Sequence, residues 1–238
     1  MTRDKPIKGI FFDAGDTLFE AKAPIGTYYS RFAARHGLDI GAETLGPRFK
    51  EAFQKAPPLA FPDASENALP GLEYQWWRRL VGHVFSGIDF PHFDLFFDEL
   101  YAFFESESAW QLFPETKSVL AALKKSGFTL GIISNFDSRL VTICRHLGIH
   151  DFFDVIVFSS QSAVAKPAPG IFKHSLKKTG LSPSESVHVG DHFENDVTGP
   201  QAVGIKALFL NRKGLNGTYK AHRSIRNLHG IHAFLKKR

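Results

Sequence analysis

The sequence predicts an α/β fold, in which a parallel sheet forms the core and an all-helical unit is inserted into it. Residues 7–18 and 113–210 carry short apolar or β-branched runs that alternate with helical patterns. Residues 21–108 carry almost no strand signal. Alternating strands and helices with short connections are typical of a parallel sheet that has helices on both faces. The 238 residues suffice for one large core and a smaller second unit.

Each element of the core is bounded by residues that stop or start regular structure. The predicted strands cover residues 7–12, 128–133, 155–158, 186–189 and 206–210. The predicted helices cover residues 114–125, 138–147, 169–179 and 195–203. Pro114 and Pro169 stand at first helical positions, and Gly148 and Gly180 stand where a C-terminal glycine ends a helix. Pro200 leaves the extent of the last helix open.

The same pattern divides the chain into two units. Residues 1–20 and 109–238 are expected to form a Rossmann-like core, and residues 21–108 a helical domain inserted after the first strand. Its helices are interrupted by turn residues, which include Gly37, Gly41, the Pro57–Pro62 stretch, Pro70 and Pro91.

Composition excludes several classes of protein. Hydrophobic residues make up 43% and charged residues 22%, as in ordinary globular proteins. Cys144 is the single cysteine, so a disulfide within the chain and a multi-cysteine zinc site are excluded. The net charge of +5 is modest, and the densest basic stretch, residues 212–238, is typical of a solvated face. We therefore expect no nucleic-acid or membrane partner, and a cytoplasmic location fits best.

Chemically active residues gather at the predicted strand ends. They are Asp13, Gly15, Asp16 and Thr17 after the first strand, Ser134 and Asn135 after the second, Lys166 in the loop beyond the third, and Gly190, Asp191 and Asp196 after the fourth. In an open α/β sheet, ligands bind beyond the carboxyl ends of the strands. Carboxylates that meet at one point repel each other unless a cation lies between them. Oxygen ligands without histidine or cysteine favour Mg²⁺, and a lysine with a hydroxyl suits a phosphoryl group.

In this order, these residues resemble the haloacid dehalogenase (HAD) superfamily. The resemblance rests on Asp13-Ala14-Gly15-Asp16-Thr17-Leu18, Ser134, Lys166-Pro167 and Val189-Gly190-Asp191 with Asp196. It covers the whole core, and the helical insertion is similar to the mobile C1-type cap of that superfamily. Within the superfamily the likeness is to the subgroup of haloacid dehalogenase-like hydrolase domain-containing protein three.

The resemblance implies a role for each residue. Asp13 would be the nucleophile, and Asp13, the Gly15 carbonyl and Asp191 would bind Mg²⁺. Ser134 and Asn135 would hold the transferring group, and Lys166 would neutralise charge on it. Thr17 and Gly190 would support the loops, and Asp196 would bind near the metal or orient Lys166.

One position departs from the pattern of the family. Its phosphatases carry a second aspartate two residues after the nucleophile, as general acid and base, and this chain has Gly15 there. Asp16 comes one residue later and is expected to be structural. Dehalogenases lack that aspartate but do not need Asp191 and Asp196. Phosphonatases use a lysine of the cap, and Lys50 and Lys55 are candidates for it. We expect both to be solvated charges on the face of a helix.

The expected function is therefore a Mg²⁺-dependent phosphatase that acts on a small phosphorylated metabolite through an aspartyl-phosphate on Asp13. The alternative is a catalytically weak protein of the same fold that binds phosphate compounds or a partner. A phosphonatase-type or dehalogenase-type hydrolase is a further alternative. The sequence does not identify the substrate.

Overall fold

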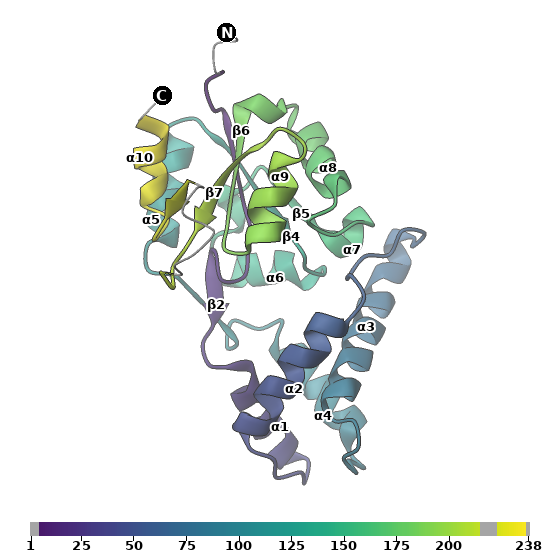
Figure 1. Cartoon of the computed structure of the whole chain (residues 1–238). Helices are drawn as coiled ribbons and strands as arrows, with labels where there is room; N and C mark the ends of the chain where they lie inside the picture. The colour runs from purple at the N-terminus through teal and green to yellow at the C-terminus, as the bar shows by residue number, and fades with distance from the viewer. Residues whose placement is uncertain (1–4, 215–222, 237–238) are drawn as a thin grey trace.

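The computed structural model describes residues 5–214 and 223–236 and contains an α/β core with a helical insertion (Figure 1). The strands are β1 (Gly9–Phe12), β2 (Phe19–Ala21), β3 (Trp110–Leu112), β4 (Thr129–Ser134), β5 (Val155–Phe158), β6 (Ser186–Gly190), β7 (Lys206–Leu210) and β8 (Ser224–Ile225). The helices are α1 (Ile25–Arg35), α2 (Ala42–Lys55), α3 (Leu69–Val84), α4 (Phe93–Phe103), α5 (Thr116–Lys125), α6 (Arg139–His146), α7 (Ser159–Ser162), α8 (Pro169–Thr179), α9 (Gly199–Gln201) and α10 (Gly230–Lys236). The α/β fold with a parallel sheet and a helical insertion is confirmed.

The sheet is parallel throughout, in the order β5-β4-β1-β6-β7-β8. Strand β1 lies between β4 and β6, and all four of its residues are buried. Successive side chains of a strand point to opposite faces. Ile10 and Phe12 therefore pack with α5, α6 and α10, whereas Phe11 packs with α8 on the other face.

The inserted helices form a second hydrophobic core. Helices α1 to α4 lie between β2 and β3, which pair antiparallel as a two-stranded ribbon at the base of the insertion. Its buried residues are largely aromatic, and Tyr29, Phe96 and Phe97 are at most 2% exposed. Figure 1 shows this block beyond the edge of the sheet at which the strands end. We call α1–α4 the cap.

The last predicted helix differs most from expectation. In place of one helix over residues 195–203, a π-helical turn covers Glu194–Thr198 and α9 is short. Pro200 lacks an amide hydrogen and so cannot donate a helical hydrogen bond to Asp196, which explains the altered spacing. Gly148 and Gly180 end their helices with left-handed φ values of 64° and 69°, as their positions predicted.

The strands β2, β3 and β8 and the helix α10 were not predicted, because each is short. The basic stretch 212–238 is more than a solvated face: Leu228, Ile231 and Phe234 from it are buried against the core. Residues 215–222 and 237–238 of that stretch lie outside the described residues. None of the described helices is long and apolar enough to cross a membrane.

Candidate active site

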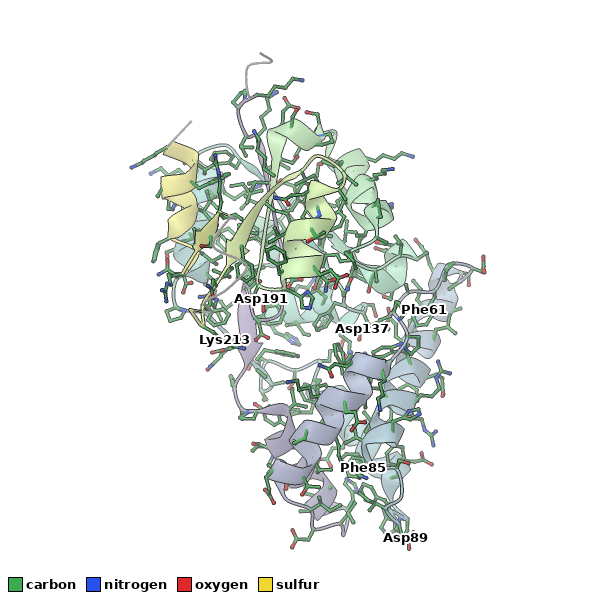
Figure 2. The ribbon with its side chains drawn as sticks, viewed as in Figure 1. Phe61, Phe85, Asp89, Asp137, Asp191 and Lys213 are labelled. Carbon is green, nitrogen blue, oxygen red and sulfur yellow. The ribbon has the colours of Figure 1, made fainter. Side chains whose placement is uncertain are left out.

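Three neighbouring strands bring the predicted site residues to one edge of the sheet. Phe12 of β1 is level with Ile132 of β4 and with Val189 of β6. The residues just beyond these positions therefore lie together. They are Asp13, Ser134 and Asp191, and Figure 2 shows Asp191 at this edge, facing the cap.

Lys166 connects two of the carboxylates. Its ammonium group donates to Oδ1 of Asp13 at 2.7 Å and to Oδ1 of Asp196 at 2.6 Å. The lysine comes from the loop between α7 and α8 and is only 5% exposed. The loop is held by Asn135, whose side-chain amide bonds both the backbone N–H and the carbonyl of Lys166, at 2.7 and 2.9 Å. Asn135 thus positions Lys166, and its predicted contact with substrate stays a prediction.

Asp196 is the most constrained carboxylate of the site. Its Oδ1 accepts from Lys166 and from Nε2 of His188, the latter at 3.0 Å, and its Oδ2 accepts from the His192 N–H at 2.9 Å. A Cβ added to Gly190 would collide with the Asp196 carboxyl, so glycine is required there. With both oxygens occupied, Asp196 is suited to orient Lys166 rather than to bind a ligand.

His188 is a site residue that the sequence reasoning missed. It is fully buried in β6, and Nδ1 of its ring has no hydrogen-bond partner among the described residues. Burial lowers its pKa, which favours the neutral ring that donates from Nε2 to Asp196. A histidine in an otherwise apolar strand was the available signal, because a buried polar side chain needs a partner.

The loop after β1 holds Gly15 and Asp16 in different backbone conformations. Asp16 is exposed, has a left-handed φ of 56° and donates its backbone N–H to the Phe19 carbonyl. Gly15 lies outside the left-handed region, and a Cβ built on it would meet nothing within 4 Å. Thr17 is buried, and its hydroxyl faces Oδ1 of Asp191 at 3.4 Å. The loop therefore has room for a side chain at residue 15.

Charge in the site is unbalanced toward the negative. Burial and, to a smaller extent, the charges of Asp13, Asp196 and Asp16 together raise the pKa of Asp191 to about 7. Burial also raises the pKa of Asp13, although Lys166 opposes this shift. Burial alone would lower the pKa of Lys166, but the two carboxylates outweigh it, and the pKa lies above its usual range. The lysine stays charged, and Asp191 has no cationic partner among the residues described.

The acidic group fits a hard cation. One carboxylate oxygen from each of Asp13, Asp191 and Asp196 lies within 4.8 Å of the others. Because both oxygens of Asp196 are occupied by donors, Asp13 and Asp191 are the side chains left to bind a metal. Oxygen-only ligands at this spacing suit Mg²⁺, and the Gly15 carbonyl is on the same loop as Asp13. Ser134 is buried at the end of β4, and no described residue hydrogen-bonds its hydroxyl, so it remains available to substrate.

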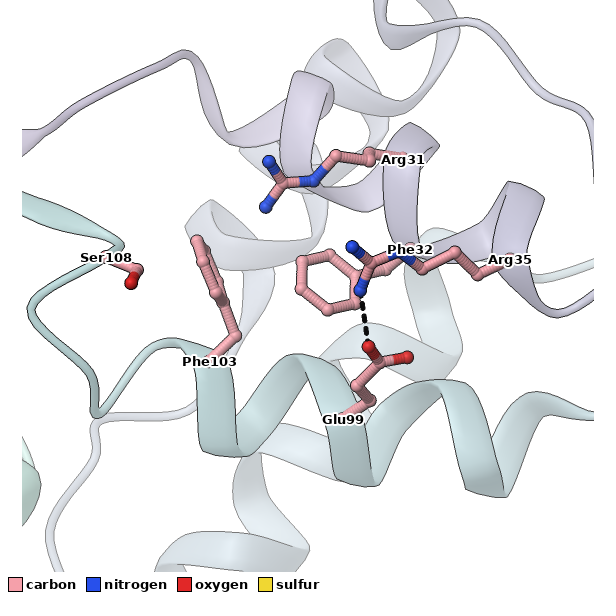
Figure 3. A pocket seen from close by; sticks show the side chains of 6 residues that line it. All are labelled: Arg31, Phe32, Arg35, Glu99, Phe103 and Ser108. Carbon is pink, nitrogen blue, oxygen red and sulfur yellow. Dashed lines mark hydrogen bonds and ion pairs between the residues drawn. The ribbon is translucent and has the colours of Figure 1, made fainter.

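A separate hollow lies within the cap (Figure 3). It measures about 450 Å³ and is lined by Arg31, Phe32, Arg35, Glu99, Phe103 and Ser108. Arg35 pairs with Glu99 across it, and the Arg31 guanidinium lies about 5 Å from the rings of Phe32 and Phe103. None of the predicted site residues lines this hollow.

Comparison with known proteins places the chain among hydrolases. The model of the haloacid dehalogenase-like hydrolase family matches residues 7–204. A curated relative, the haloacid dehalogenase-like hydrolase domain-containing protein 3 of Bos taurus, is 34% identical over 203 residues, which are 84% of this chain and 80% of that protein.

Solved structures share the fold over almost the whole chain. A HAD phosphatase from Thermococcus onnurineus matches with a TM-score of 0.69 at 24% identity, covering 96% of this chain and 98% of that one. A 2-haloacid dehalogenase from Pseudomonas syringae matches with a TM-score of 0.66 at 26% identity, covering 97% and 99%. The putative hydrolase YfnB from Bacillus subtilis, solved bound to magnesium, matches with a TM-score of 0.70 at 17% identity, covering 98% and 100%.

Proposed function

Because this chain belongs to the haloacid dehalogenase-like hydrolase family, we propose that it is a Mg²⁺-dependent phosphatase that acts on a small phosphorylated metabolite through Asp13. One observation carries the proposal most directly. The Asp13 carboxylate is fixed at Oδ1 by the buried ammonium of Lys166, and it stands beside a second carboxylate, Asp191, that has no cationic partner among the described residues.

The residues present can carry out phosphoryl transfer to Asp13. Lys166 holds Oδ1, which leaves Oδ2 to attack phosphorus. An Asp13 O–P bond forms while the bond from phosphorus to the ester oxygen breaks, and the leaving group departs as an alkoxide or phenolate with the electron pair of that bond and takes a proton from solvent. Water then attacks phosphorus, which releases inorganic phosphate and regenerates the Asp13 carboxylate. The Ser134 hydroxyl and the Lys166 ammonium are suited to bind the phosphoryl oxygens.

A metal held by Asp13, Asp191 and the Gly15 carbonyl would supply positive charge to the phosphoryl oxygens. The magnesium bound to YfnB supports this assignment by analogy. Asp196 would act through Lys166, which it holds at 2.6 Å.

Gly15 makes the proposed reaction selective. No side chain at this position can protonate the leaving group, and general acid–base help is worth about 10²–10⁴-fold in rate. The enzyme should therefore prefer substrates with good leaving groups, such as acyl phosphates or aryl phosphates. The same gap favours the second candidate function, a protein of this fold that binds phosphate compounds with weak turnover.

The other hydrolase types are less well supported. A phosphonatase needs a desolvated amine on the cap, but Lys50 and Lys55 are both exposed, and Lys55 pairs with Glu51 at 2.6 Å. A dehalogenase has no use for Asp191, the member of the acidic group that has no cationic partner among the described residues. Phosphonates and 2-haloacids as substrates distinguish these two hydrolase types from a phosphatase.

The test is a panel of phosphate monoesters, acyl phosphates, phosphonates and 2-haloacids, each assayed with Mg²⁺ and with a chelator. We expect Mg²⁺-dependent release of phosphate from the first two classes. Turnover of 2-haloacids that survives chelation would replace the proposal with dehalogenation. Binding of phosphate compounds with no turnover of any class would support the binding protein instead.

A further inference from the structure

The contact between cap and core contains a buried carboxylate with an unusual set of partners. Glu73, on cap helix α3, is fully buried. It accepts from the Ser138 backbone N–H at 3.0 Å, from the Ser138 hydroxyl at 2.5 Å and from the Ser160 hydroxyl at 2.5 Å. All three donors belong to the core, so the partners of Glu73 exist only while the cap lies against the core.

A second set of contacts crosses the same interface. Trp77, one turn along α3, donates its indole N–H to Oδ2 of Asp137 at 2.5 Å. The Arg139 guanidinium, paired with Asp137 at 2.7 Å, donates to the Tyr101 carbonyl at 3.2 Å and lies 3.9 Å from the centre of the Tyr101 ring. Asp137 is fully buried and stands near the border between cap and core (Figure 2).

These contacts converge on the segment that follows the second site strand. Strand β4 ends at Ser134, and the segment from Asn135 to Ser138 leads from it into α6. Glu73 and Asp137 both place a carboxylate at the N-terminus of α6, where peptide dipoles favour negative charge. Asn135 in turn bonds the backbone of Lys166 on both sides. Hydrogen bonds at the two ends of the backbone segment from residue 135 to residue 138 thus link Glu73 to the backbone of the lysine that holds Asp13.

We propose that Glu73 is a positioning residue, which with Trp77 couples the closing of the cap to the alignment of Ser134, Asn135 and Lys166. The inference rests on the proposed phosphatase function for its catalytic part. When the cap opens, Glu73 loses all of its hydrogen-bond donors. The loop from residue 135 to residue 138 then loses its hydrogen bonds to Glu73 and Trp77. Closing restores these bonds and fixes the loop before phosphoryl transfer.

Hydrogen exchange on the free protein tests the structural part without any substrate. In Glu73→Gln, which keeps the shape of the side chain but removes its charge, we expect faster amide exchange over residues 136–141 and over the connection 104–109. Trp77→Phe should act in the same direction, since it removes one bond to Asp137 and keeps a ring. The matched control is Glu99→Gln, because Glu99 is a cap carboxylate that pairs with Arg35 and His36 inside the cap. Unchanged exchange in both variants, or equally faster exchange in Glu99→Gln, would overturn the inference.

Kinetics test the catalytic part. With p-nitrophenyl phosphate and Mg²⁺, Glu73→Gln should lower kcat by roughly ten- to a hundredfold, the loss that a small misplacement of reacting groups causes, and should change KM much less. Ser160→Ala should lower kcat in the wild type and have little further effect in Glu73→Gln, because the two residues share one bond. An unchanged kcat in Glu73→Gln, together with faster exchange, would show that Glu73 holds cap and core together but does not position the catalytic groups. Absence of turnover in the wild-type protein would refute the phosphatase proposal. The hydrogen-exchange result would still show whether Glu73 holds the cap against the loop from residue 135 to residue 138.

Discussion

At the scale of single residues, Gly15 and Asp16 are the positions at which this chain departs from the pattern expected of a phosphatase in its family. The left-handed backbone of this loop is at Asp16, with a φ of 56°, whereas Gly15 has open space beside it and no positive φ. Asparagine tolerates the left-handed region at least as well as aspartate does. Both positions can therefore be substituted without forcing the loop.

We predict that Gly15→Asp speeds hydrolysis of phosphate esters with poor leaving groups more than that of esters with good ones. The gain can approach the 10²–10⁴-fold or so that general acid–base help provides. Asp16→Asn should change these rates little. The measurement is kcat/KM for a series of aryl and alkyl phosphates of rising leaving-group pKa.

Melting temperature and Mg²⁺ affinity of the Gly15→Asp protein serve as controls. A stable, metal-binding variant without any gain that depends on the leaving group would contradict the missing-acid hypothesis. A large loss in Asp16→Asn, greatest for poor leaving groups, would assign the acid role to Asp16.

His188 gives a second prediction at this scale. Because its pKa is lower in the folded protein than in the unfolded chain, the unfolded chain takes up the proton first as the pH falls. Its neutral ring therefore stabilises the fold above pH 6.5 or so, and this part of the stability is lost below that value, by up to about 1.4 kcal/mol per pH unit. Asp196, Lys166 and Asp13 are the charged groups that face it.

We expect the free energy of unfolding of the metal-free wild type to fall more between pH 7 and pH 5 than that of His188→Gln. Glutamine keeps an N–H donor for Asp196 but cannot gain a proton. Denaturant unfolding at a series of pH values measures both slopes. If the unfolding free energies of the two proteins fall equally with pH, His188 does not cause the loss of stability in acid.

At the scale of elements, the core strands and helices could be predicted from sequence, because each carries an apolar pattern, the helices are followed by glycine, and the strands stop at polar residues or glycine. The same rule placed Asp13, Ser134 and Asp191 together, since neighbouring parallel strands end at one edge. Short elements such as β2 and β8 contain too few residues to show an alternation of apolar and polar side chains. Contacts made by Glu73 and His188 could not be predicted, because their partners lie in other segments and only the fold brings them together.

The crossing of α1 and α2 in the cap gives a prediction at this scale. A Cβ on Gly26 would lie 2.5 Å from the Ala42 carbonyl and 2.8 Å from the Gly46 nitrogen, both of them backbone atoms. Gly26→Ala should therefore destabilise the cap by about 1–3 kcal/mol, as overpacking does. Gly71→Ala, in α3, meets nothing within 4 Å and should stabilise its helix by up to about 1 kcal/mol.

Urea unfolding of both variants, followed by tryptophan fluorescence, provides the comparison. Trp76 and Trp77 lie in the cap and report on it directly. Equal stability of Gly26→Ala and the wild type would mean that the two helices can separate at no cost.

At the scale of the whole molecule, two hydrophobic cores meet at the edge of the sheet where the site residues gather. The cap core surrounds Phe96 and Tyr29, and the sheet core surrounds Phe12 and Ile132. The β2–β3 ribbon and the polar contacts around Glu73 link the two. We expect closing of the cap over this edge to limit the access of water to Asp13.

Attack of Asp13 on phosphorus is tested most directly by trapping the phosphorylated residue in single turnovers. With excess enzyme, Mg²⁺ and p-nitrophenyl phosphate in H₂¹⁸O, we predict that acid quenching and borohydride reduction convert Asp13 to homoserine, with ¹⁸O in the released phosphate and none in the Asp13 carboxyl. Release of phosphate with no adduct trapped on Asp13 would show direct attack of water instead. Asp13→Asn should fold normally and release no phosphate. Appearance of ¹⁸O in Asp13, as attack of water on a carbon ester of that residue would give, or undiminished phosphate release by Asp13→Asn, would contradict the account.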